Sequence, residues 1–298
     1  MFNKGIFMSK LMRSVSGIRG VVGDTLTPQV LFSHTKAFLE ITNAKKIVIG
    51  RDSRPTGEAI VQMVSGFCRL CGVDVIDAGL ATTPSVEILV TELNADAGII
   101  ITASHNPLEW NALKFLNAKG LFLGPDDVKK LFALADEGKF SFPDYKEMGS
   151  YEFLDDADSV HIQGTLAIPF VDVQAIRKAK FKVAIDAVNG AGSLIVPRLL
   201  EELGCEVVRV HCSPNGNFPR GAEPLPENLK DLSKAVLEHN CAVGFALDPD
   251  ADRCAIVCGE GRAIGEEYTL AIASEEVLSQ KPGNVCINLS TSRMNEDV

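Results

Sequence analysis

The sequence predicts an α/β protein with mostly parallel, mixed sheets. The first observation is the order of elements over residues 46–101, where short apolar strands alternate with helical segments. The second is that the same order begins again near residue 182 and continues to about residue 247. Strands that alternate with helices pair in parallel through right-handed crossovers, and such sheets bind ligands at the carboxyl ends of their strands. Loops that directly follow strands are therefore the first candidates for a functional site.

Composition limits the class of protein. The chain has 298 residues, of which 46% are hydrophobic and 23% are charged, as expected for a globular protein with more than one domain. A formal charge of −10 argues against a nucleic-acid partner. No stretch has the length and hydrophobicity of a signal peptide or a membrane span, so we expect no membrane partner. Eight scattered cysteines, with a single C-x-x-C inside a helical pattern, indicate no disulfide framework and favour a cytoplasmic location.

The first half contains a complete strand and helix alternation. Ser16-Gly17-Ile18-Arg19-Gly20 reads as a glycine-rich turn that holds a guanidinium. Gly72 ends one helix, and Thr83-Pro84 supplies the N-cap and first-turn proline of the next. A polar, turn-rich stretch places a domain boundary near residues 150–157. The predicted elements are strands at 46–50, 73–77 and 97–101, helices at about 57–71, 83–93 and 125–136, and a return hairpin at 115–123.

The second half repeats the pattern. The turn Gly190-x-Gly192 lacks the third glycine of a dinucleotide fingerprint, because Ile195 occupies that place, so a helix-initiating turn is favoured over a nucleotide site. A loop rich in proline follows the second strand of this half. The predicted elements are strands at 182–186, 205–210, 241–247, 254–258 and 284–289, and helices at 193–203, 227–239 and 266–280.

A serine follows the buried strand at residues 97–101. The loop reads Thr102-Ala103-Ser104-His105-Asn106-Pro107, and Pro107 disfavours helical angles at the preceding residue, so the strand must give way to a loop. We expect Ser104 and His105 on a loop tip that a rigid strand supports. By itself, a serine beside a histidine also fits the nucleophile of a hydrolase triad.

Three aspartates at alternate positions form the second constellation, in the loop Asp248-Pro249-Asp250-Ala251-Asp252-Arg253 between two apolar strands. In an extended segment, alternate side chains face one side, so we expect the three carboxylates to converge. Converging carboxylates repel one another unless a cation joins them, and hard oxygen ligands suit Mg²⁺. An EF-hand is excluded, because Arg253 and Gly259 stand where it needs Gly and Glu. An aspartate-dependent phosphatase and an exposed acidic turn remain as alternatives.

These segments together closely resemble the α-D-phosphohexomutase superfamily, which includes phosphoglucomutase, phosphomannomutase and phosphoglucosamine mutase. The resemblance rests on T-A-S-H-N-P, on the three-aspartate loop followed by Arg253, and on residues 16–20 and 51–55, and it extends from about Val15 onward. It implies repeated three-layer α/β/α domains. The expected limits are 1–152 for domain I with the phosphoserine loop, 153–257 for domain II with the metal-binding loop, and 258–298 for the start of domain III. The sugar-selecting loop of domain III and the phosphate clamp of domain IV have no match, so we expect the third domain to be incomplete and the fourth absent.

The resemblance also implies residue roles. Ser104 would carry the phosphoryl group, and His105 lies beside it. One Mg²⁺ would be held by Asp248, Asp250, Asp252 and an oxygen of the phosphorylated Ser104. Arg19 and Arg253 would stabilise phosphate charge, and Lys114 would be the general acid/base.

The expected substrate is a hexose 1- or 6-phosphate, with a hexose 1,6-bisphosphate as intermediate and activator. The preferred sugar and the oligomeric state stay open, and activity of this chain alone is expected to be weak or absent. The alternative from another class is a non-catalytic module that binds metal and phosphosugar.

Overall fold

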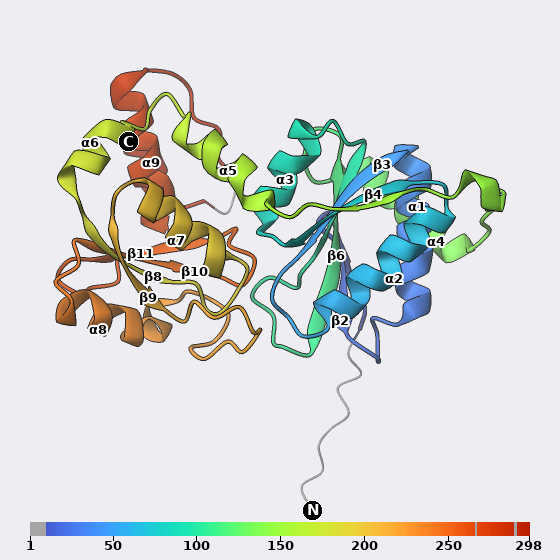
Figure 1. The fold of residues 1–298 in the computed structure, drawn as a ribbon, viewed down its shortest axis with the longest axis horizontal. Helices are drawn as coiled ribbons and strands as arrows, with labels where there is room; N and C mark the ends of the chain where they lie inside the picture. The colour runs from blue at the N-terminus through green and yellow to red at the C-terminus, as the bar shows by residue number, and fades with distance from the viewer. Residues whose placement is uncertain (1–9, 266, 289–290) are drawn as a thin grey trace, which may run out of the picture. The chain divides into compact units, whose positions relative to one another are not determined.

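The computed structural model describes residues 10–265, 267–288 and 291–298, and the chain divides into two compact units, Met1–Ala157 and Asp158–Val298 (Figure 1). Each unit contains a mixed sheet covered by helices. The predicted α/β class with mostly parallel, mixed sheets is therefore confirmed. The predicted domain limits at residues 152 and 257 stay predictions.

The sheet of the first unit has seven strands in the order β1-β2-β6-β5-β3-β4-β7. Strand β3 pairs in parallel with β4 and β5, while β6 runs antiparallel to β5 and β2. The carboxyl ends of β3 and β5 therefore meet at one edge of the sheet. The strands are β1 (Met12–Ser14), β2 (Gly17–Val21), β3 (Lys46–Arg51), β4 (Asp74–Leu80), β5 (Ala97–Ile101), β6 (Trp110–Asn117) and β7 (Tyr151–Phe153).

Helices cover both faces of this sheet, as Figure 1 shows. Helices α1, α2 and α4 bury their apolar faces in one cluster with residues of the central strands, and α3 packs against β3 and β5. In that cluster Phe38 of α1 stacks on Phe115 of β6, with ring centroids 4.7 Å apart. The helices are α1 (Pro28–Thr42), α2 (Gly57–Leu70), α3 (Thr83–Glu92) and α4 (Pro125–Glu137), with a 3₁₀ turn at Tyr145–Glu147.

The second unit has a four-stranded sheet in the order β11-β10-β8-β9. Strand β8 pairs in parallel with β9 and β10, and β11 closes the sheet antiparallel to β10. Helix α8 packs on one face and α7 on the other, on either side of the sheet in Figure 1. The strands are β8 (Lys182–Asp186), β9 (Glu206–Val210), β10 (Val243–Leu247) and β11 (Cys254–Cys258). The helices are α5 (Ala157–Leu166), α6 (Val173–Ala179), α7 (Gly192–Glu202), α8 (Lys230–Glu238) and α9 (Glu267–Gln280), with 3₁₀ turns at Pro226–Asn228 and Arg293–Glu296.

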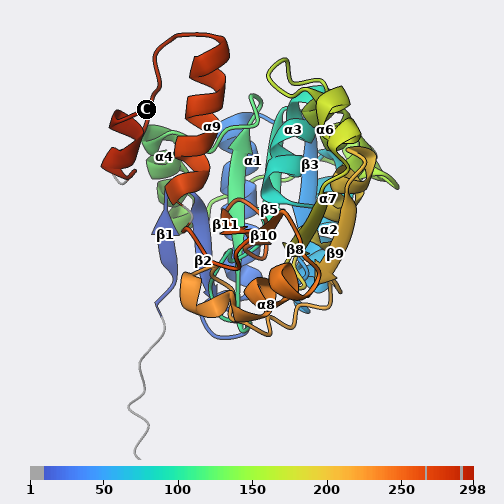
Figure 2. The same ribbon diagram turned by 90° about the vertical axis from the view of Figure 1, so that its left-hand side faces the viewer.

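The predicted strand at residues 284–289 is wrong for the part that the structure describes. Residues 284–288 have no strand partner, and residue 289 lies outside the described residues. Helix α9 packs beside β11 of the second unit (Figure 2). The predicted helix at 266–280 is confirmed from residue 267 onward, since residue 266 is also outside the described range. No third sheet forms among the described residues.

Two local predictions in the first unit also need correction. Helix α3 is capped by Thr82, whose side chain accepts a hydrogen bond from the Ser85 backbone N–H at 3.1 Å, so Thr83 is its first residue rather than its cap. The glycine-rich turn at 16–20 is largely strand β2. Gly17 has φ +120°, and a Cβ at this position would lie 2.0 Å from the Leu113 carbonyl oxygen of β6. This close strand contact requires glycine.

We predict that Phe38→Ala destabilises the first unit by about 3–5 kcal/mol, because it removes a fully buried aromatic ring and leaves a cavity beside Phe115. Denaturant unfolding followed by far-UV circular dichroism measures the loss. Leu70→Ala on α2 is the control, since Leu70 is 62% exposed and should change stability by less than about 0.5 kcal/mol. Equal losses for the two variants would contradict the assignment of this cluster as the core.

Candidate functional site

The serine loop begins where β5 ends. Ser104 has a left-handed backbone with φ 49°, and its backbone N–H donates to Thr102 Oγ1 at 2.9 Å. The Asn106 N–H donates to the Ala103 carbonyl at 3.0 Å, which closes the turn. Ser104 lies in the expected loop after β5, and its side chain is largely buried, with 6% of the residue exposed. A left-handed serine is uncommon and costs backbone energy, so neighbouring groups must hold this turn in place.

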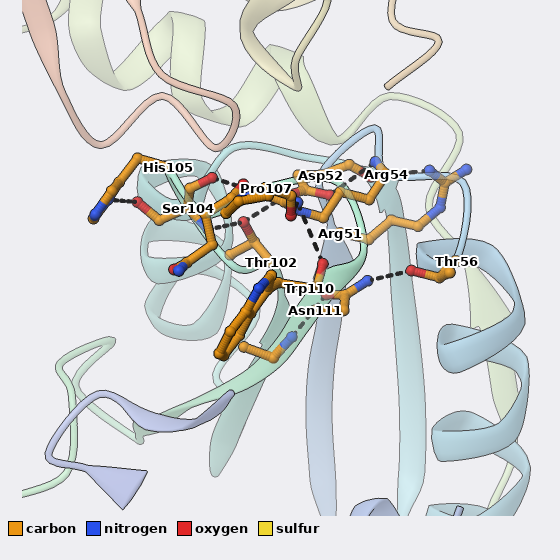
Figure 3. A network of polar contacts seen from close by, with 12 residues as sticks. Arg51, Asp52, Arg54, Thr56, Thr102, Ser104, His105, Pro107, Trp110 and Asn111 are labelled. Carbon is orange, nitrogen blue, oxygen red and sulfur yellow. Dashed lines mark hydrogen bonds and ion pairs between the residues drawn. The ribbon is translucent and has the colours of Figure 1, made fainter. Parts of the chain in front are cut away.

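A buried ion pair from the end of β3 fixes the same loop (Figure 3). Arg54 Nε lies 3.0 Å from Asp52 Oδ2, and neither side chain is exposed to solvent. Arg54 donates to the carbonyl oxygens of Ser104 at 2.6 Å, Asn106 at 2.8 Å and Pro107 at 2.7 Å. The Thr102 hydroxyl donates to Asp52 Oδ2 at 2.6 Å. One planar guanidinium therefore satisfies several carbonyls that no strand pairs, and a short polar network determines where Ser104 stands.

Three predicted site residues lie together in this unit. His105 Nδ1 is 3.3 Å from Ser104 Oγ, within hydrogen-bonding distance. Arg19 on β2 donates to Asn106 Oδ1 at 2.7 Å and so reaches the serine loop. Strand β2 places Arg19 there because it pairs with β6, which directly follows the loop. Arg19 is thus distant from Ser104 and His105 in sequence but contacts the loop that carries them.

Lys114 is buried on β6, 6% exposed, with its Nζ 3.5 Å from the Thr83 hydroxyl at the start of α3. The amine also lies over the Phe122 ring, 5.8 Å from its centroid. A buried lysine needs polar or charged partners. Burial also shifts the pKa of a lysine readily, and catalytic lysines that exchange protons are often buried for this reason. These contacts do not test its predicted role as general acid/base.

The three aspartates of the second unit do converge. One carboxylate oxygen each from Asp248, Asp250 and Asp252 lies within 4.8 Å of the others; Asp248 and Asp250 are buried and Asp252 is exposed. The predicted reason was wrong, because the loop is a turn rather than an extended segment, with Ala251 left-handed at φ 56°. The Arg253 backbone N–H donates to Asp248 Oδ1 at 3.2 Å, which closes the turn around the carboxylates.

Burial, together with the charges of Asp250 and Asp252, raises the pKa of Asp248 well above its usual value, while the Arg253 backbone N–H opposes this shift. The cluster is therefore electrostatically unfavourable by itself. Three carboxylate oxygens, two of them buried, are a donor set that fits Mg²⁺, whose charge removes the repulsion. The described residues thus fit a single hard cation.

The Gly190-x-Gly192 turn packs directly under the aspartate loop. A Cβ at Gly190 would lie 2.5 Å from the Pro249 carbonyl oxygen, and the Ala191 N–H donates to that oxygen at 2.8 Å. The glycines therefore bring two loops together, as expected of a turn that begins helix α7, rather than forming a dinucleotide fingerprint.

The remaining sequence expectations concern cysteines and membranes. All eight cysteines are free thiols, and burial raises the pKa of Cys68, the buried member of the C-x-x-C pair. Within the described residues, no helix combines the length and hydrophobicity needed to cross a bilayer.

Sequence reasoning missed the groups that hold the two loops. Residues 51–55 follow a predicted strand and carry part of the resemblance, but nothing in the sequence shows that Arg54 reaches the carbonyls of residues 104, 106 and 107. The available signal was the short charged segment itself, because a buried Asp and Arg at the end of an apolar strand must find partners.

We predict that Arg54→Gln destabilises the first unit by about 3–5 kcal/mol, because the buried Asp52 carboxylate loses its charge partner. Urea unfolding measures this. The matched control is Arg13→Gln, which breaks the more exposed ion pair with Asp136 at 2.6 Å and should cost no more than about 1 kcal/mol. If both variants lose the same stability, Arg54 does not hold the serine loop.

A second prediction concerns pH and Mg²⁺. Because the folded pKa of Asp248 is raised, the folded state holds its proton more tightly than the unfolded state, so this group costs stability as pH rises above about 4. In EDTA, wild type should therefore lose stability relative to Asp248→Asn as the pH rises from about 4 to 8. Saturating Mg²⁺ should stabilise wild type by about 2.7 kcal/mol at 100 times Kd and should not stabilise Asp248→Asn to that extent.

Thermal melts in EDTA and in Mg²⁺ at several pH values measure both effects. Glu238→Gln, a change at an exposed carboxylate of the same unit, should behave like wild type. A constant difference between wild type and Asp248→Asn across this pH range would contradict the electrostatic account.

Each of the two units contains a segment that matches a known protein domain. Residues 10–142 match the family described as phosphoglucomutase/phosphomannomutase, alpha/beta/alpha domain I, and residues 160–261 match its domain II. A protein of Methanopyrus kandleri named "Probable phosphoglucosamine mutase" is 36% identical over 287 residues, which are 95% of this chain and 62% of the relative. A "Phosphoglucomutase/phosphomannomutase" of Thermococcus kodakarensis is 35% identical over 292 residues, 95% of this chain and 63% of its own length.

A solved structure of a phosphoglucomutase/phosphomannomutase family protein from Burkholderia thailandensis has a TM-score of 0.75 at 30% identity, and the match covers 96% of this chain and 65% of that one. The chain thus spans less than two thirds of the length of these relatives. The domain I match contains the serine loop, and the domain II match contains the aspartate loop. The chain belongs to the phosphoglucomutase/phosphomannomutase family of the α-D-phosphohexomutase superfamily.

Proposed function

We propose that this chain carries the phosphoryl-transfer residues of a phosphohexomutase, which interconverts hexose 1-phosphate and hexose 6-phosphate through a phosphoserine at Ser104. The observation that carries the proposal is the fixed, left-handed position of Ser104, whose carbonyl Arg54 holds at 2.6 Å and whose hydroxyl faces His105 at 3.3 Å. Phosphoryl transfer depends mainly on positioning and charge neutralisation. A rigid serine among basic groups provides the positioning.

The reaction would proceed in two balanced transfers. In the first, the bond between phosphorus and Ser104 Oγ breaks while a sugar hydroxyl oxygen bonds to phosphorus, and the proton of that hydroxyl passes to a base, for which we propose Lys114. The product is a hexose 1,6-bisphosphate. In the second transfer, Ser104 Oγ takes the other phosphoryl group, and the same base returns the proton to the departing sugar oxygen. The net change is isomerisation of the sugar phosphate.

The basic residues would bind and orient phosphate. Arg19 already lies against Asn106 of the serine loop, so its charge is available where the phosphoryl group would stand. Arg253 follows the aspartate loop and is about one third exposed. His105, beside Ser104 Oγ, would donate to a phosphoryl oxygen.

Asp248, Asp250 and Asp252 would hold one Mg²⁺, and an oxygen of the phosphorylated Ser104 is proposed to complete its ligands. When bound, the ion supplies positive charge that offsets the charge on the phosphoryl oxygens. The chain's own contribution is to keep three carboxylates together in a turn that the Arg253 N–H closes.

The proposed substrate is a phosphosugar, glucose, mannose or glucosamine phosphate, with hexose 1,6-bisphosphate as activator. The relatives bear the names of a phosphoglucosamine mutase and of a phosphoglucomutase/phosphomannomutase, which supports this class without selecting one sugar.

The eight free thiols support a location in the reducing cytoplasm.

Phosphorylation of Ser104 is the direct test. Incubation with glucose 1,6-bisphosphate and Mg²⁺ should add the mass of one phosphoryl group to the wild-type chain, measured by intact-mass spectrometry. Ser104→Ala should gain none, and Ser14→Ala, a change at an exposed serine of the same unit, should gain as much as wild type.

A wild-type chain that is neither phosphorylated when isolated nor phosphorylated by the bisphosphate would contradict the proposal. In that case, binding of the sugar phosphate without transfer would favour the non-catalytic module. Turnover of a hexose 1-phosphate by this chain would exclude that module.

A further inference from the structure

We propose that Arg220 and Glu223 are positioning residues that fix the two ends of the aspartate loop and thereby set its affinity for a divalent cation. Both lie on the segment between β9 and α8, residues 211–229, which the sequence marked only as a proline-rich loop. The inference rests on the proposed function in one respect, namely that the loop at 248–252 binds a cation.

Arg220 holds the start of the aspartate loop. Its Nε lies 2.8 Å from Asp186 Oδ2 at the end of β8, with 3% of the Arg220 side chain and none of the Asp186 side chain exposed. Its terminal nitrogen Nη2 donates to the Leu247 carbonyl at 2.6 Å and lies 3.4 Å from the Asp186 carbonyl. Leu247 directly precedes Asp248. The Arg220 side chain therefore joins the carboxyl ends of the neighbouring parallel strands β8 and β10, next to the first carboxylate of the aspartate loop.

Glu223 holds the other end. Its Oε1 accepts a hydrogen bond from Arg253 Nη1 at 2.7 Å, and the Arg253 backbone N–H in turn donates to Asp248 Oδ1 at 3.2 Å. Arg253 directly follows Asp252. The Glu223 and Arg253 side chains are 33% and 32% exposed, so the pair orients the guanidinium while leaving it accessible to an anion from solvent.

The first unit contains the same arrangement independently. There Asp52 follows the central strand β3 and pairs with the buried Arg54, which donates to carbonyls of the serine loop. In the second unit Asp186 ends the central strand β8 and pairs with the buried Arg220, which donates to the carbonyl before the aspartate loop. Each unit thus uses one guanidinium to bind backbone carbonyls in, or directly before, the loop proposed to carry its chemistry. Repetition of this solution on two sheets indicates that it has a role beyond filling space.

The electrostatics of the loop explain why such support is needed. Three carboxylates within 4.8 Å repel one another, and two are buried. A turn held only by its own backbone would relieve this by opening, which would move the ligands apart before a cation arrives. Supports of this kind typically change metal affinity by about 10- to 100-fold.

The test is Mg²⁺ binding by the whole chain, measured by isothermal titration calorimetry, with the free energy of unfolding in EDTA measured separately. Arg220→Lys keeps the charge but cannot bridge Asp186 and Leu247, and should raise the Kd for Mg²⁺ by about 10- to 100-fold. Glu223→Gln keeps the shape and loses the ion pair, and should raise the Kd by a smaller factor.

Two kinds of control separate an effect on the geometry of the aspartate loop from a general loss of folding stability. Arg209→Lys and Glu201→Gln alter an ion pair of the same unit that is about half exposed, and should leave the Kd within about two-fold of wild type. Val236→Ala removes part of the buried core on α8, so it should lower unfolding stability without changing the Kd of the folded chain.

The outcomes distinguish a failure of the positioning role from a failure of the proposed function. A wild-type chain that binds Mg²⁺ while both variants bind it equally well overturns the positioning role and leaves the proposed function intact. A wild-type chain that binds no Mg²⁺ overturns both. If Arg220→Lys does not fold, Glu223→Gln decides the matter, since its partly exposed pair is not needed for the core.

Discussion

The two functional loops depend on how backbone carbonyls at the ends of parallel strands are satisfied. Beyond the last pair of a strand ladder, carbonyls point into protein without a strand partner, and each would cost free energy if left unpaired. In the first unit Arg54 donates to carbonyls of residues 104, 106 and 107, and in the second Arg220 donates to those of residues 186 and 247. Each arginine is itself neutralised by a buried aspartate. These two ion pairs therefore hold the backbone at the start of the aspartate loop and along the serine loop.

Fixed loops allow chemistry that a flexible chain could not support. Ser104 occupies a left-handed conformation, and the aspartates keep carboxylates within 4.8 Å of each other, although both arrangements are unfavourable in isolation. The surrounding sheets provide the necessary stability, because β3, β5, β8 and β10 are bound on both sides by neighbouring strands. The central strands of each unit thus offset the unfavourable free energy of the two loops.

How well each strand or helix was predicted depends on how strongly its surroundings restrict its residues. The central strands at 46–51, 97–101 and 182–186 were predicted almost to the residue, since continuous apolar β-branched runs have one good environment, a sheet covered on both faces. Strands β1 and β7 were not predicted, because they are three-residue edge strands whose residues are all exposed. Strand β2, which lies between β1 and β6, was predicted as a glycine-rich turn. Helix α1 was also missed, although Thr27 and Pro28 carry the capping signal that defines its start.

The sequence by itself determined the class of fold, the family resemblance and the candidate site residues, because these depend on local pattern: a serine after one strand, and three aspartates after another. Only the tertiary structure decided how those groups are held. The aspartates converge through a left-handed Ala251 rather than an extended segment, and Arg54, Arg220 and Glu223 act on carbonyls or side chains many residues away. Such contacts depend on sheet register and loop packing, and neither leaves a periodic signal in the chain.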